Sequence, residues 1–144
     1  METHVDLHAL VHAAGDAIIV ADVEGLIVLW SPAAERLFGF TTAEAVGHSL
    51  DLIIPERFRE RHWQGYHAVM RTGQTRYQAN VLRVPARRKD GQRLSIAFTV
   101  ALLHTSDGYL TGIAAIVRDD TERWQEEQAL RRRLAELEGR SGAA

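Results

Sequence analysis

Apolar residues recur along this chain with two periods, and these separate expected strands from expected helices. Strict alternation over residues 93–103 predicts a long strand whose buried face carries Leu94, Ile96, Phe98, Val100 and Leu102. Runs rich in β-branched and aromatic residues predict four more strands, at 17–21, 26–30, 76–84 and 109–117. The chain therefore has five expected strands.

Turn-forming residues join these strands into antiparallel pairs. Asp22–Gly25 separates the first two strands, and Asp90-Gly91 and Asp107-Gly108 connect the last three into a meander. We expect the first hairpin to add its two strands to an edge of that meander. The predicted fold class is α+β, a five-stranded antiparallel sheet with short helices and one long helix on one face.

The long helix is predicted over residues 55–72. A period near 3.6 places Phe58, His62, Tyr66, Val69 and Met70 along one side. Pro55 suits the first turn of a helix, and Gly73 can end it in a left-handed cap.

Two further short helices are expected between the first hairpin and Pro55. Ser31-Pro32 combines an N-cap residue with a first-turn proline, and Thr41–Glu44 has the pattern of a capping box.

The two ends of the chain carry helical patterns with surplus apolar residues. Residues 5–14 predict a short helix, and residues 121–138 predict a highly charged helix with a sparse stripe of Trp124, Leu130, Leu134 and Leu137. That stripe fits either a solvated terminal helix or a parallel coiled coil, and the leucine spacing of four and three favours the coiled coil. We therefore expect a homodimer through the terminal helices. The expected organisation is a flanking helix at 1–15, a core domain at 16–120, a signalling helix at 121–138 and a tail at 139–144.

Composition excludes several classes of function. The 17 basic and 19 acidic residues give a net charge of −2, which is not the basic footprint of a nucleic-acid-binding protein. The absence of cysteine excludes disulfides, thiolate metal sites and a cysteine–flavin photochemical site. The N-terminus does not resemble a signal peptide, and no apolar run approaches the roughly 20 residues that cross a bilayer. We expect a cytoplasmic protein without membrane contact.

Histidine offers the one candidate for ligand chemistry. The seven histidines form no motif such as His-Glu-x-x-His, and a phosphate-binding glycine loop and a nucleophile elbow are both absent, so we expect no enzyme. His62 lies in the apolar stripe of the long helix. It is either a hydrogen-bonded structural residue or a neutral imidazole available to a metal.

Four segments resemble the PAS sensory domains: DAIIVADVEGLIVLWSPAAERLFGF, AVGHSLDLIIPERF, RRKDGQRLSIAFTV and TGIAAIVRDDTER. Together they span Asp16 to Arg123. The resemblance implies a bacterial sensory domain whose sheet cups a small ligand or partner and whose C-terminal helix passes the signal to a downstream protein. A ligand-free dimerisation module is the alternative of the same fold.

The segment from Pro55 to Gly91 is similar to the haem-binding PAS domain of rhizobial oxygen-sensor kinases. This likeness implies haem b with His62 as axial iron ligand, Arg76 near a propionate, and Tyr77, Phe98 and Val100 along the gas side. Leu82 stands where that family has the arginine that binds oxygen, so such a sensor would favour carbon monoxide or nitric oxide. The candidate ligand-binding residues are Tyr66, Met70, Arg76, Tyr77, Leu82, Phe98 and Val100. Haem, another small ligand and no ligand all stay open.

Overall fold

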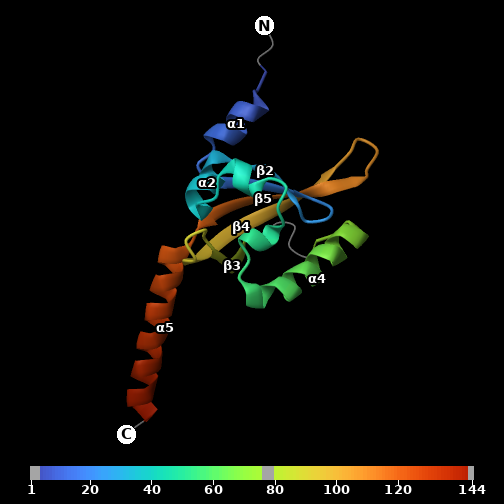
Figure 1. Ribbon diagram of the computed structural model, residues 1–144. Coiled ribbons are helices and arrows are strands. Elements are labelled where there is room, and N and C mark those ends of the chain that lie inside the picture. The colour runs from blue at the N-terminus through green and yellow to red at the C-terminus, as the bar shows by residue number, and fades with distance from the viewer. Residues whose placement is uncertain (1–3, 76–79, 143–144) are drawn as a thin grey trace.

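The computed structural model describes residues 4–75 and 80–142. Within them a five-stranded antiparallel sheet has the strand order β2-β1-β5-β4-β3 (Figure 1). The strands are β1 (Ala17–Asp22), β2 (Ile27–Trp30), β3 (Leu82–Arg87), β4 (Arg93–His104) and β5 (Leu110–Asp119). The predicted α+β class is confirmed, and so is the pairing, because β1 joins the meander at β5.

Three of the helices begin or end at the cap residues that the sequence predicted. They are α1 (Leu7–Ala13), α2 (Pro32–Phe38), α3 (Thr42–Ala45), α4 (Glu56–Thr72) and α5 (Thr121–Gly142), with a 3-10 turn at Leu50–Leu52. The Ser31 side chain caps α2, the Thr41–Glu44 capping box caps α3, and Gly73 ends α4 with a φ of 68°. The C-terminal helix runs past residue 138, because a single glycine at 139 costs only about 1 kcal/mol in a helix.

Strand β3 differs from its expected bounds of 76–84. It occupies Leu82–Arg87 and includes Pro85, which pairs with Ser95. A proline is tolerated there because β3 is an edge strand and its outer side needs no backbone donor. Arg76 and Tyr77, two of the candidate site residues, lie outside the described residues.

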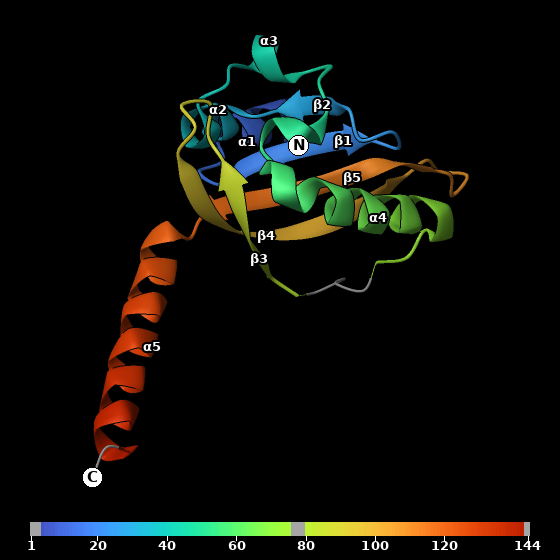
Figure 2. The same ribbon diagram turned by 60° about the horizontal axis from the view of Figure 1, so that its bottom comes forward.

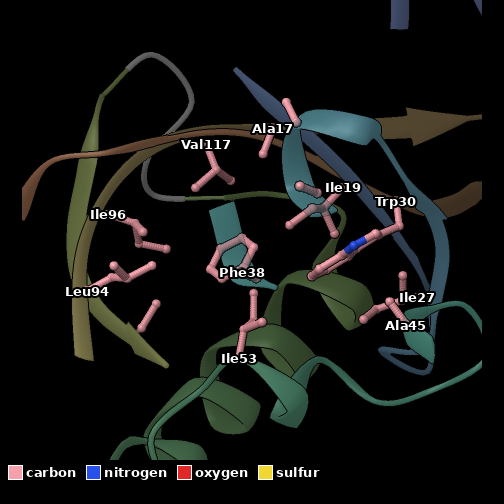
Figure 3. Close-up of a cluster of buried hydrophobic side chains, with 13 residues drawn as sticks. Ala17, Ile19, Ile27, Trp30, Phe38, Ala45, Ile53, Leu94, Ile96 and Val117 are labelled. Atoms are coloured by element: carbon pink, nitrogen blue, oxygen red, sulfur yellow. The ribbon is translucent and has the colours of Figure 1, made fainter. Parts of the chain in front are cut away.

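The core is dense at the α2 end of the sheet. In Figure 3, Trp30 of β2 and Phe38 of α2 lie in one cluster with Ile19, Ile53 and Val117. Phe38 and Ile27 have no exposed surface at all. The interior of this end of the domain is filled by its own side chains.

The face of β4 expected to be buried is buried, but unevenly. Leu94 and Ile96 are buried, whereas Phe98, Val100 and Leu102 are only partly so. On the opposite face Ala97 is also buried, because Arg83 and Arg118 flank it on the neighbouring strands. Apolar packing therefore loosens along β4 away from the α2 end.

Candidate ligand site beneath helix α4

Helix α4 lies across one face of the sheet and is held there by polar side chains (Figure 2). The Tyr66 hydroxyl donates a hydrogen bond to the backbone oxygen of Asp22 at the end of β1. The Trp63 indole Nε1 donates to a carboxylate oxygen of Asp51 at 2.7 Å. These two bonds connect α4 to the first half of the chain.

The inner stripe of α4 is the predicted one, and most of it stays partly buried. Tyr66 is 6% exposed, while Phe58, His62, Val69 and Met70 keep more of their surface. The apolar side chains of α4 are thus incompletely covered, as are Phe98, Val100 and Leu102 of β4. This layer between α4 and the sheet is therefore the candidate site for an apolar ligand.

His62 lies between two aromatic rings on this stripe. Its ring centroid is 4.7 Å from that of Trp63, in an edge arrangement, and 5.7 Å from that of Tyr66. Its Nδ1 atom is fully buried and has no hydrogen-bond partner. A buried polar atom without a partner costs free energy, and a ligand or an ordered water at this atom would offset that cost.

Burial lowers the pKa of His62 below its ordinary value of 6.5, and the nearby His67 lowers it further while Asp51 opposes the shift. The imidazole is therefore neutral at pH 7. A neutral imidazole keeps one nitrogen lone pair, and this is the form that binds a metal.

Stability should fall in mild acid because of this residue. Since the pKa of His62 is lowered in the folded state, the unfolded chain binds more protons as the pH drops through about 6.5 toward the folded value. A His62→Phe protein should lose this part of the pH dependence, measured as the urea-unfolding free energy at pH 8 and pH 5.5. An unchanged difference between the two pH values would assign the dependence to other groups.

The candidate residues of the sheet share its inner face. Leu82 pairs with Phe98 across β3 and β4, and Phe98 and Val100 pair with Val117 and Ala115 of β5, so all five lie on one face. Leu82, Phe98 and Val100 are partly buried. The structure brings these three predicted residues together.

Arg83, adjacent to Leu82, turns to the opposite face. Its Nε lies 3.4 Å from a carboxylate oxygen of Asp120, at the start of α5. It therefore supplies no hydrogen-bond donor to the inner face, as the alternation along β3 predicts.

The candidate residues Tyr66 and Met70 of α4 differ in how firmly they are held. The Tyr66 hydroxyl is engaged by Asp22, and burial together with Asp22 raises its pKa to about 12, so it stays protonated as an anchor. Met70 is partly buried on the same helix face. The contributions of Trp63 and Asp51 were not predicted from the sequence, because their hydrogen bond joins residues that belong to different elements.

His62 would be a lone protein ligand to any metal. Within the described ranges, no three His, Asp or Glu side chains gather closely enough to hold a metal ion. In the same part of the chain, no helix is both long and apolar enough to cross a membrane.

A small antiparallel sheet with a long helix across one face and a helix leaving its last strand is the architecture of the PAS fold. The family model described as the PAS fold matches residues 6–119. The chain belongs to the PAS family, as the sequence resemblance implied.

Relatives among curated proteins are much longer. The sensor protein FixL of Bradyrhizobium diazoefficiens is 36% identical over 138 residues, which are 94% of this chain and 26% of FixL. The oxygen sensor protein DosP of Escherichia coli is 24% identical over 102 residues, or 71% of this chain and 13% of DosP. The chain thus spans about a quarter or less of these two proteins.

Solved structures agree on the fold. An RNA-binding light-oxygen-voltage receptor matches with a TM-score of 0.73 and 25% identity, over 90% of this chain and 36% of that one. The PAS domain of a Colwellia psychrerythraea protein matches with a TM-score of 0.70 and 20% identity, over 81% of this chain and 95% of that one.

Proposed function

We propose that this domain senses a small ligand held between α4 and the inner face of the sheet, and that haem bound through His62 is that ligand. The observation that carries the proposal is the buried Nδ1 of His62, which has no partner and belongs to a neutral imidazole. A neutral imidazole whose nitrogen has no protein partner keeps the lone pair that a haem iron needs from an axial ligand.

The surroundings of His62 fit a haem better than a bare metal ion. A bare ion needs several protein ligands, and no such group occurs in the described residues, whereas a porphyrin brings four nitrogen ligands of its own. Leu82, Phe98 and Val100 offer apolar side chains on the inner face of the sheet that are only partly covered. Bound haem would supply an iron atom that takes up a diatomic gas.

The similarity to known sensors supports the same proposal. The sequence of 55–91 resembles haem-binding PAS domains, and one relative is an oxygen sensor by name. Because Leu82 and Val100 offer no hydrogen bond, and Arg83 faces away, we infer that this domain favours carbon monoxide or nitric oxide over oxygen.

An absorbance titration tests the proposal. Purified protein mixed with hemin should develop a sharp Soret band at one equivalent, and the reduced form should shift with carbon monoxide. A spectrum identical to that of free hemin would reject haem. It would leave a PAS domain that binds another small ligand or none.

We also propose that the domain works as a homodimer and sends its signal through α5. Exposed apolar residues gather on both terminal helices: Val5 and Leu7 of the N-terminal segment are 70% exposed, and Leu130 of α5 is 68% exposed. Helix α5 extends away from the sheet in both views (Figures 1 and 2), so its leucines need a partner from another chain or domain. The relatives of this chain are longer than the chain itself, which is consistent with a downstream signalling domain. The cytoplasmic location stays a prediction.

The dimer is testable by light scattering. Leu134 lies in the middle of the leucine stripe of α5, so Leu134→Lys should shift the protein toward monomer, while Ala135→Lys beside it should not. A dimer that survives Leu134→Lys would place the interface on α1 or the sheet.

A further inference from the structure

A second groove lies outside the His62 site, between the start of α4 and the hairpin that joins β3 to β4. Its volume is about 600 Å³, and Arg57, Arg87 and Arg93 all line it. Glu56 is the one acidic residue of its lining. The groove shares no lining residue with the wall of the His62 site.

Backbone bonds fix the three arginines relative to one another. The Arg87 N–H donates to the Ile53 carbonyl oxygen at 2.8 Å, so the end of β3 is joined to the segment that leads into α4 (Figure 2). Arg87 and Arg93 are direct cross-strand partners in the β3–β4 ladder. The groove is therefore a built feature of the fold, although its side chains come from three segments.

Each of these arginines occupies an electrostatically unfavourable position. Arg57 lies in the first turn of α4, where the helix dipole disfavours a positive charge, and the N-cap residue Pro55 offers no side-chain acceptor. Arg87 and Arg93 place like charges directly opposite each other, which destabilises a sheet.

Nothing in the described part of the chain neutralises the three charges by an ion pair. Instead, the guanidinium carbons of Arg57 and Arg93 lie 4.6 and 5.8 Å from the centroid of the same ring, that of Phe58. A cation–π contact leaves the N–H donors of a guanidinium free for an anion. Two of the arginines are thus oriented while their hydrogen-bond donors remain unused.

We propose that this groove binds a small oxyanionic ligand of the phosphate type. Guanidinium groups present parallel N–H donors that match the oxygens of a phosphate, and three of them line this groove without an ion-pair partner among the described residues. A volume of about 600 Å³ is in the range of small-molecule sites. Binding would relieve the repulsion between Arg87 and Arg93, so the ligand should stabilise the fold.

Titration with pyrophosphate at constant ionic strength tests the assignment. In ¹H–¹⁵N spectra, the amides of residues 56–58 and 86–93 should shift and saturate, whereas chloride at equal ionic strength should leave them unshifted. Arg87→Gln and Arg93→Gln should each weaken binding about tenfold, the size of one charged hydrogen bond. Arg71→Gln, at the far end of α4 and outside the groove, should bind as the wild type does.

Thermal unfolding of the ligand-free protein at low salt separates binding from structure. Because Arg87 repels Arg93, Arg87→Gln should unfold at an equal or higher temperature than the wild type while binding pyrophosphate less tightly. Shifts that do not saturate, an Arg71→Gln variant weakened as much as Arg87→Gln, or a destabilised Arg87→Gln would overturn the proposal. Binding of citrate but not of pyrophosphate would overturn the phosphate assignment.

Discussion

Alanine in place of His62 should weaken hemin binding by at least about 100-fold, because loss of a mere supporting residue around a metal ligand already costs 10- to 100-fold. Within the described residues no three His, Asp or Glu side chains gather as a metal site, so His62 has no ready-made set of ligands to take its place. The measurement is the Soret absorbance at increasing hemin concentration. The same titration on the wild type gives the reference.

His67→Ala is the matched control for this substitution. His67 lies one turn further along α4, is exposed, and stacks on Trp63 with ring centroids 5.8 Å apart. Its loss should leave the Soret band within about twofold of the wild-type affinity, because it lines neither wall of the site. If His62→Ala still bound one hemin with the wild-type spectrum, His62 would be a structural residue and the haem proposal would fail at this position.

Gly25→Ala should lower the free energy of unfolding by about 3 kcal/mol, the sum of two separate costs. Gly25 has a φ of +87°, which costs an L-residue roughly 1–2 kcal/mol. A methyl group there would also lie 2.2 Å from Cη2 and Cζ3 of Trp63, and such overpacking typically costs about 1–3 kcal/mol. The Trp63 ring cannot retreat freely, because its indole N–H donates a hydrogen bond to Asp51 and its ring packs in T-shaped arrangements against His62 and Tyr66.

Gly47→Ala isolates the backbone part of that cost. Gly47 has almost the same φ, +90°, but nothing lies within 4 Å of a methyl group added there. Urea unfolding should therefore show a loss of about 1–2 kcal/mol for Gly47→Ala and a larger loss, with altered tryptophan fluorescence, for Gly25→Ala. Equal losses would mean that Trp63 moves aside at little cost and does not hold α4 in place.

Local patterns predicted most elements of the fold. The alternation over 93–103 and the glycines at 73 and 91 placed β4, the end of α4 and the β3–β4 turn correctly. Strand β3 was misplaced because a proline normally ends a strand, and only the strand order shows that Pro85 sits on an edge. The position of a strand within its sheet depends on partners that lie far away in the sequence.

The candidate site was predicted in part. Periodicity alone placed His62 and Tyr66 on the inner face of α4, and alternation placed Leu82 and Arg83 on opposite faces of β3. The same reasoning could not foresee that Tyr66 would anchor to Asp22, 44 residues earlier in the chain. Hydrogen bonds between elements leave no periodic signal, so they appear only once the chain is folded.

The sequence by itself determined the order of helices and strands, the caps and turns, and the face on which His62 lies, because each depends on residues a few positions apart. Only the tertiary structure decided that packing is dense around Phe38 and incomplete beneath α4, and that Nδ1 of His62 has no partner. It also brought Arg57 to Arg87 and Arg93. Packing density, burial and the convergence of charges depend on contacts between distant segments, and these are set when the layers close on one another.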